Sequence, residues 1–457
     1  MKIKIHNNDI SIKLSCETNY ASSDSVHNLQ AVISVIGGKS VPDNKIQKVA
    51  LVIALDISLS MSGKKISTVK SIIKYLFENL SSNCYISIIL FNDTPINLTD
   101  SLQQTTSENL TMIYDKLLKI KPSGGTNLTD TLILMVNQIS VFKETNNQPV
   151  EALLFTDGCH NIGSTWKLTK QVIKDRLEEY TFPINNFTVG SQTESKKLLK
   201  IANMTAGGYY KHIENIEEIS TTFGSYIGLL KSRISSDISI RLKAKSGSRI
   251  SSVVGIDTMR YVNKTAKDIT YYIGGLSAEQ QRTLLINLSI RGLTSEELKL
   301  FTYGEQLLVK IKISIDGVIV TKYLKINRVN RFTNNISNEK LVYLYEAVLK
   351  NKMVICLEEV AKYVEIGDNY NAELVILETI SDLTNYLGTL VNKFAVDSIN
   401  ELKNINTKLH NILQKSTLCN LISSHIHQQG GRYETFAEVS SSEDIKNYVK
   451  REQIKTS

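Results

Sequence analysis

The sequence of 457 residues has few cysteines, no long hydrophobic run and no concentrated charge. Its five cysteines are scattered and odd in number, and no two of them form a C-x-x-C pair. This usage argues against a disulfide framework and against a structural zinc site, and it is typical of a reducing compartment. We therefore expect an intracellular, cytoplasmic protein.

Signals for membranes and for nucleic acids are also missing. No stretch approaches the roughly 18 apolar residues of a membrane-spanning helix. Residues 1–14 alternate polar and apolar side chains, which is not the pattern of a signal peptide. The net charge of +8 is spread along the chain, whereas nucleic-acid-binding proteins concentrate positive charge in a patch or stripe. We expect no membrane span and no nucleic-acid partner.

Several enzyme motifs are absent as well. The glycine and two lysines at 63–65 lack the spacing of a phosphate-binding P-loop, and no G-x-S-x-G nucleophile elbow occurs. Asp56 lacks the second aspartate two residues later that phosphoaspartate phosphatases use. His425 and His427 are two ligands, whereas zinc sites need three or four. The sequence therefore predicts a protein that is not an enzyme.

The strongest positive signal is the apolar stretch 49–57, which carries Asp56 near its end and is followed by Ser58 and Ser60. A short run rich in valine and isoleucine is typical of a strand buried on both faces, as in a parallel sheet. Ligands of open α/β sheets bind beyond the carboxyl ends of such strands. The Asp-x-Ser-x-Ser segment is therefore a candidate site.

Strand and helix patterns alternate over residues 48–232. After the first strand, the predicted strands are 85–91, 150–158, 184–189 and 208–212, and the predicted helices are 66–80, 108–118, 129–141, 167–179, 196–204 and 216–230. This alternation predicts a Rossmann-like, doubly wound α/β domain. Its parallel sheet is covered by helices on both faces, because right-handed crossovers place them there.

The regions before and after residues 48–232 show a different hydrophobic periodicity. Residues 235–332 alternate apolar and polar side chains and contain a hairpin signal at Asp316-Gly317, so we expect an antiparallel β-sandwich domain. The strands expected in residues 1–47 are too few to form a domain and would complete this sandwich. The α/β domain would then be an insertion in a β domain.

Residues 335–425 carry apolar side chains at helical spacing. They predict a C-terminal helical region of three or so helices, as a small bundle or hairpin, with a coiled-coil dimer through the last helix as the alternative. The tail 426–457 is polar, and its composition predicts flexibility. The fold class expected for the whole chain is thus multidomain, α/β with an added β-sandwich and an added helical region.

Two further loops at predicted strand ends carry oxygen-bearing side chains, Thr126 in Gly-Gly-Thr-Asn and Asp157 in Phe-Thr-Asp-Gly. Together with Asp56, Ser58 and Ser60, and in this order, they resemble the metal-ion-dependent adhesion site of the von Willebrand factor A domain family. The resemblance covers roughly residues 48–230. It implies that these five residues are the metal-binding residues.

These residue types suit a hard divalent cation. Mg²⁺ prefers oxygen ligands in octahedral geometry and uses few carboxylates. Ser58, Ser60 and Thr126 offer neutral hydroxyls, and Asp56 and Asp157 offer charge. With the hydroxyls as inner ligands, as in the family, the ion keeps positive charge and takes a further ligand from outside. The resemblance therefore implies Mg²⁺, or Mn²⁺ or Ca²⁺ in its place, and a protein partner with an exposed Asp or Glu.

The same residues are compatible with more than one role. Strand-end Asp and Ser residues also cap the helices that follow them. The family commonly has glycine between the two serines, where this chain has Leu59, which leaves the type of ligand open. The preferred hypothesis is a non-enzymatic, metal-dependent protein–protein interaction module or scaffold. The alternatives are a metal-assisted hydrolase, for which the sequence shows no general base or substrate pocket, and a structural self-assembly protein with a vestigial ion site.

Overall fold

The computed structural model describes most of residues 2–409 and, beyond them, the single residues Leu418, Ile422 and Asp444. Within 2–409 the residues left out are 6–7, 19, 23–24, 40–43, 159, 190–194, 214–215, 246, 256–259, 266, 295, 298–304, 330–337 and 387–391. The tail predicted to be flexible, 426–457, lies outside the described residues apart from Asp444.

The middle of the chain forms a seven-stranded sheet in the order β11-β10-β9-β5-β6-β7, with β8 beside β6. Its strands are β5 (Ala50–Asp56), β6 (Tyr85–Phe91), β7 (Pro95–Asn97), β8 (Gln103–Gln104), β9 (Val150–Thr156), β10 (Ile184–Val189) and β11 (Tyr209–Ile213). The strands pair in parallel, except that the short β7 and β8 run antiparallel to β6. This confirms the predicted parallel central sheet.

Helices cover both faces of this sheet. They are η1 (Leu59–Met61), α1 (Lys64–Asn79), α2 (Ser107–Leu118), α3 (Leu128–Thr145), α4 (Trp166–Glu179), α5 (Ser195–Met204) and α6 (Ile216–Lys231). Alternate residues of β5 enter different cores: Leu51, Ile53 and Leu55 pack with α1, α2 and α6, and the residues between them pack with α3, α4 and α5. All seven residues of β5 are buried, which is why its sequence is an unbroken apolar run.

Two further sheets face each other and form a sandwich. One has the order β1-β2-β4-β18-β14 and the other the order β15-β16-β13-β19-β20-β3. Their strands are β1 (Lys2–Ile5), β2 (Asn8–Cys16), β3 (Tyr20–Ser22), β4 (His27–Gly37), β13 (Ile238–Ala244), β14 (Ser248–Gly255), β15 (Arg260–Thr265), β16 (Asp268–Tyr272), β18 (Gln281–Ile290), β19 (Glu305–Ile315) and β20 (Val318–Val329). Apolar residues of both sheets share one core, as the alternating pattern predicted.

The hairpin between β19 and β20 has the predicted turn. Asp316 and Gly317 both have positive φ, 45° and 84°, which a two-residue hairpin turn of type I′ requires. The N-terminal strands β1, β2 and β4 share a sheet with β18 and β14, while β3 pairs with β20.

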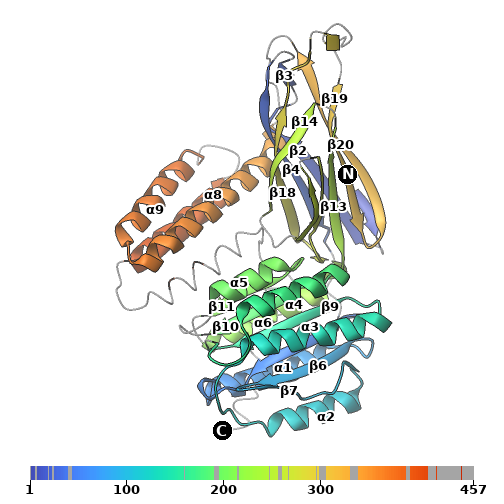
Figure 1. Ribbon diagram of the computed structural model, residues 1–457, viewed down its shortest axis with the longest axis vertical. Coiled ribbons are helices and arrows are strands. Elements are labelled where there is room, and N and C mark those ends of the chain that lie inside the picture. The colour runs from blue at the N-terminus through green and yellow to red at the C-terminus, as the bar shows by residue number, and fades with distance from the viewer. Residues whose placement is uncertain are drawn as a thin grey trace.

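The chain leaves the sandwich after β4 and returns to it at β12 (Arg233–Ser235), which pairs with β17 (Leu276–Ser277). The end of β4 and the strand β12 lie close together. A side chain at Gly37, the last residue of β4, would collide with Ser277 of β17 and with the Ile234 side chain of β12. Figure 1 shows the α/β unit and the sandwich stacked along the long axis.

Helices α8 (Asn338–Ile366), α9 (Asn369–Thr384) and α10 (Asn392–Leu409) form the helical region and have their own core. The first turns of α8 pack on the five-stranded sheet, where Leu344 and Ala347 contact Val32 and Leu285. The apolar face of α10 is buried within this chain, which favours the bundle over the coiled-coil dimer. No helix of the described part is long and apolar enough to cross a membrane.

The sandwich meets the α/β unit at the amino ends of the parallel strands. Glu151, the second residue of β9, is 5% exposed and pairs with Arg233 at 2.7 Å. Its other carboxylate oxygen accepts from the hydroxyl of Tyr226 on α6 and from the Asn185 amide, the latter at 3.2 Å. The buried Glu151 carboxylate thus links the parallel sheet to α6 and to β12, the strand through which the chain returns to the sandwich.

We expect Glu151→Ala to lower the free energy of unfolding by about 3 kcal/mol, because it leaves the Arg233 guanidinium half-buried without its carboxylate. Urea unfolding of the full chain measures this. The matched control is Glu179→Ala, which breaks an exposed pair with Arg176 and should leave the midpoint nearly unchanged. Equal shifts for the two variants would contradict a structural role for the buried pair.

Candidate metal centre

Three loops meet at the carboxyl edge of the parallel sheet, opposite the junction with the sandwich. The first follows β5 and the second follows its parallel neighbour β9. The third, residues 124–127, lies between α2 and α3, so the prediction that Thr126 follows a strand is wrong. Its Gly124 carbonyl accepts from the Leu59 N–H at 3.1 Å. The structure therefore places the loops that carry the five predicted ligands beside one another.

Asp56 is the last residue of β5 and has no exposed surface. One carboxylate oxygen accepts from the Ser58 N–H at 2.8 Å, and the other accepts from the Thr156 hydroxyl at 2.6 Å. Burial is the main cause that raises the pKa of Asp56 to about 6, and the nearby Asp157 carboxylate adds to it. A buried carboxylate with this pKa gains from a cation that neutralises it.

A line of hydrogen bonds joins the other residues of the two strand-end loops. The Ser58 and Ser60 hydroxyl oxygens lie 3.0 Å apart, and the Ser60 hydroxyl donates to Asp157 at 2.8 Å. Ser58 and Asp157 are buried at 2% and 5% exposure, while Ser60 is exposed. The set is therefore closed below by the sheet and open to solvent at Ser60.

Thr126 completes the set from the third loop. Its N–H donates to the Asn161 side chain at 2.8 Å, and its carbonyl accepts from the Asn161 N–H at 3.1 Å. Its hydroxyl faces the residue after Asp157, because a Cβ at Gly158 would lie 2.9 Å from the Thr126 hydroxyl oxygen. Glycine at 158 thus allows the second and third loops to approach this closely.

Asp93 holds the third loop from the side of β6. Its carboxylate accepts from the Gly125 N–H at 2.7 Å, and a Cβ at Gly124 would lie 2.6 Å from it. Gly124 also has φ +75°, a conformation that favours glycine. Gly125 is restricted by its neighbours instead, because a Cβ there would lie 2.9 Å from the side chains of Asn161 and Ile162. Asn127 caps α3 by accepting from the Asp130 N–H at 3.1 Å.

Lys65 of α1 lies against the centre and was not predicted from the sequence. Its ammonium group is ion-paired with Asp157 and also reaches the Ser60 carbonyl at 3.3 Å. The Lys65 side chain is 26% exposed, so this charge sits at the solvent side of the set. No local motif marks Lys65, because its partner is 92 residues away in sequence.

Leu59 lies on the 3-10 turn between the two serines and is 66% exposed. Its backbone N–H is bound to Gly124, so the turn is fixed while the side chain projects into solvent. Leucine at this position therefore adds an apolar surface beside the hydroxyls without displacing either serine.

The donor set fits a hard divalent cation. Two carboxylates and three hydroxyls from three loops offer oxygen ligands with limited negative charge, which suits an ion that keeps water or an outside ligand. Elsewhere in the described part of the chain, no group of three or more His, Cys, Asp or Glu side chains offers an alternative metal site. That the five residues bind a metal stays a prediction.

Comparison with known proteins identifies the α/β unit. Residues 49–211 match the family model of the von Willebrand factor type A domain. The chain contains a von Willebrand factor type A domain. This confirms the family resemblance found in the sequence, and the matched range spans all three loops of the candidate centre.

Among curated proteins, part of this chain is similar to inter-alpha-trypsin inhibitor heavy chains. Heavy chain H3 of Bos taurus is 27% identical over 189 residues, which cover 36% of this chain and 21% of that protein. Heavy chain H3 of Homo sapiens is 30% identical over 115 residues, covering 24% and 13%. The matched stretch spans at most about a fifth of these relatives, so the similarity concerns only a part of each protein.

Two solved structures share the fold over most of the chain. A von Willebrand factor type A protein from Catenulispora acidiphila has a TM-score of 0.68 at 16% identity, covering 90% of this chain and 92% of that one. The ArnB paralog VWA2 from Sulfolobus acidocaldarius has a TM-score of 0.54 at 15% identity, covering 92% and 98%. The similarity therefore extends beyond the A domain.

The raised pKa of Asp56 predicts a pH dependence in EDTA. The folded-state pKa, about 6, lies above the ordinary value of 3.8, so the native state binds this proton more tightly than the unfolded chain. The contribution of Asp56 to the free energy of unfolding therefore falls as pH rises from about 4 to about 6, by up to about 3 kcal/mol. Asp56→Asn removes this titration.

Urea unfolding at several pH values measures the difference between wild type and Asp56→Asn. We expect the variant to gain stability relative to wild type up to about pH 6 and the difference to level off above that. Asp115→Asn, an exposed aspartate on α2, is the control. A difference between Asp56→Asn and wild type that does not change with pH would contradict the assignment.

Proposed function

We propose that the A domain holds a divalent cation, Mg²⁺ or in its place Mn²⁺ or Ca²⁺, and through it binds an acidic residue of a partner protein. Domains of this family commonly mediate protein–protein interaction or adhesion. Ser58, Ser60 and Thr126 would bind the ion through their hydroxyls, and Asp56 and Asp157 would supply charge directly or through water. The bound ion would supply electrostatic attraction for a carboxylate.

The observation that carries this proposal is the line of contacts from Asp56 through Ser58 and Ser60 to Asp157. It gathers oxygen ligands at one edge, buried below and open at Ser60. Helix capping alone does not account for this arrangement, because the Ser58 side chain makes no capping hydrogen bond to η1 and Ser60 bonds to a residue 97 positions away.

Lys65 sets a condition on cation binding. Its ammonium group is the positive charge next to Asp157, and a divalent ion beside the same carboxylate would repel it. Cation binding therefore requires the Lys65 side chain to swing toward solvent, where it is already partly exposed. Lys65 acts as a competitor that weakens the affinity of the site for metal.

Leu59 offers a second contact to the same partner. It projects beside the open side of the centre and is 66% exposed. A partner whose carboxylate reaches the ion would cover this side chain, and burying a leucine contributes about 2 kcal/mol. We infer preference for a partner segment with an apolar residue near its Asp or Glu.

The wider role that we propose is that of a non-enzymatic scaffold in which the sandwich and helical region carry the A domain. We also propose an intracellular location, which the scattered cysteines support.

We expect Mn²⁺ or Mg²⁺ to raise the melting temperature of the wild-type chain, because only the native state has the assembled site. At a hundredfold excess of free ion over Kd, the gain is about 2.7 kcal/mol. Asp56→Ala and Thr126→Ala should abolish it, and Lys65→Gln should reach it at lower ion concentration. Differential scanning fluorimetry measures all four proteins.

The controls are Ser62→Ala and Lys64→Gln, exposed neighbours outside the proposed set. Both should respond to the ion as the wild type does. A shift that persists in Asp56→Ala would place the ion elsewhere, and no shift in the wild type at millimolar ion would refute metal binding.

Partner capture tests the functional step. Affinity purification with the full chain in Mg²⁺ should retain a protein that EDTA releases and that Asp56→Ala fails to retain. Replacing Leu59 by Ser should weaken retention while leaving the metal-induced melting shift intact. A partner held equally with EDTA would argue against recognition through the ion.

A further inference from the structure

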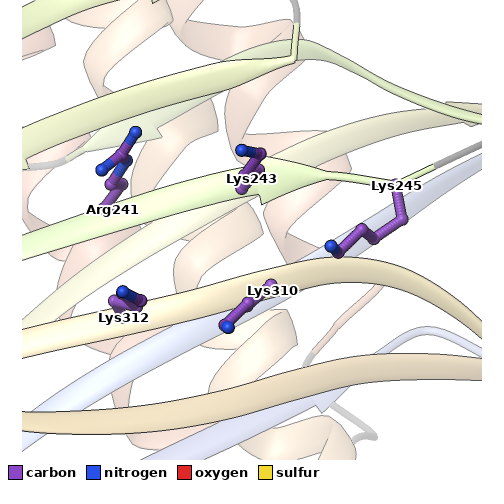
Figure 2. A pocket seen from close by; sticks show the side chains of 5 residues that line it. All are labelled: Arg241, Lys243, Lys245, Lys310 and Lys312. Atoms are coloured by element: carbon purple, nitrogen blue, oxygen red, sulfur yellow. The ribbon is translucent and has the colours of Figure 1, made fainter.

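A second charged surface lies on the sandwich, on the outer face of the six-stranded sheet. Its five cationic side chains are named the basic face here: Arg241, Lys243 and Lys245 along β13 and just beyond it, and Lys310 and Lys312 on β19. They line a shallow hollow of about 170 Å³. Figure 2 shows them on two neighbouring strands.

The pairing register places like charges directly opposite one another. Arg241 is opposite Lys312, and Lys243 is opposite Lys310. Directly opposed like charges destabilise an antiparallel sheet. The buried side chains between them, among which are Leu242 and Ile311, belong to the sandwich core, so the alternation of the strands holds all the cations on one face.

Little negative charge offsets these cations. Asp268 of β16 accepts two hydrogen bonds from Arg241, at 2.9 and 2.8 Å. Asp268 also lies opposite Lys243, whose charge helps to lower the pKa of this carboxyl. Within the described residues, no ion pair within 4 Å is formed by the four lysines of the basic face. One carboxylate against five cations leaves a surplus of four positive charges over a small area.

The spacing of the cations is regular. Alternate residues of a strand are about 6.8 Å apart and neighbouring strands about 4.8 Å apart. An extended peptide repeats its side chains at the same interval of about 6.8 Å, so acidic residues at alternate positions would match the cations along β13. A compact anion would reach only part of this array.

We propose that the basic face binds an extended acidic segment of a partner protein, with carboxylates on alternate residues. The bound segment would remove the repulsion between the opposed cations. This surface belongs to the sandwich, whereas the candidate metal centre lies at the edge of the A-domain sheet that faces away from the sandwich. The inference therefore stands independently of the proposed metal site.

Two other polyanions fit the face less well. A membrane surface is favoured by apolar side chains that insert among the cations, but the exposed Val318 and Ile319 lie at the hairpin end, level with the start of β13. A single nucleic-acid strand is held by several stacking aromatics. On the neighbouring strands, Tyr323 lies opposite Lys310 and is 47% exposed, and the half-buried Tyr272 lies opposite Ser239, so two aromatic side chains border the described part of the basic face.

Fluorescence anisotropy with the full chain in EDTA tests the proposal. The probe is a labelled peptide of alternating Glu and Ser, about ten residues long, and its comparison is the same composition with all Glu in one block. The variant Lys243→Gln/Lys310→Gln removes one opposed pair. We expect it to bind the alternating peptide at least about fivefold more weakly than wild type.

The matched control is Lys116→Gln/Lys119→Gln, which removes two exposed lysines from the A domain and the same total charge. It should bind as the wild type does. Equal weakening in the two double variants would reduce the effect to net charge and overturn the site, and equal affinity for the two peptides would overturn the alternating register.

A second measurement is thermal melting, first without and then with the alternating peptide. Because opposed lysines repel each other, Lys243→Gln/Lys310→Gln should melt at a higher temperature than wild type without peptide, while losing the further rise that the peptide gives the wild type. An unchanged melting temperature without peptide would contradict the repulsion. Tighter binding of oligo-dT or of phosphatidylserine vesicles through the same lysines would also refute the proposal.

Discussion

β5 runs through the middle of the A domain with every residue buried, and it ends in an aspartate. The carboxylate cannot reach solvent, so its stability depends on what the neighbouring loops offer: the Ser58 N–H and the Thr156 hydroxyl. These contacts draw the ends of β5 and β9 together. The Ser60 hydroxyl then meets Asp157, and Thr126 enters from the third loop. The geometry of the candidate centre thus follows from burying one charge at a strand end.

The amino edge of the same sheet, where the parallel strands begin, faces the sandwich. There Glu151 is also a buried carboxylate, but it is neutralised within the chain by Arg233 and hydrogen-bonded to Tyr226. That edge joins α6 to the sandwich and is closed. The two ends of the parallel strands therefore differ: at the amino end Glu151 is neutralised by the half-buried Arg233, whereas at the carboxyl end Asp157 pairs with Lys65, whose side chain reaches solvent.

Much of the fold follows from local patterns. The unbroken apolar run of β5, the Asp-Gly hairpin and the strand–helix alternation each depend on neighbouring residues, and the structure confirms them. Contacts between distant segments could not be predicted in this way. Lys65 meets Asp157 only because α1 follows β5, and the basic face exists only because β13 pairs with β19 in one register.

The close approach at Gly37 has a consequence for how the chain is built. The segment that departs after β4 and the segment that returns at β12 touch across this glycine, so the two chain connections between the A domain and the sandwich lie side by side. Removing or exchanging the whole domain would require bridging only a short gap, with the sandwich strands left in register. The architecture is that of an inserted domain, in which the A domain can be exchanged while the sandwich that carries it stays the same.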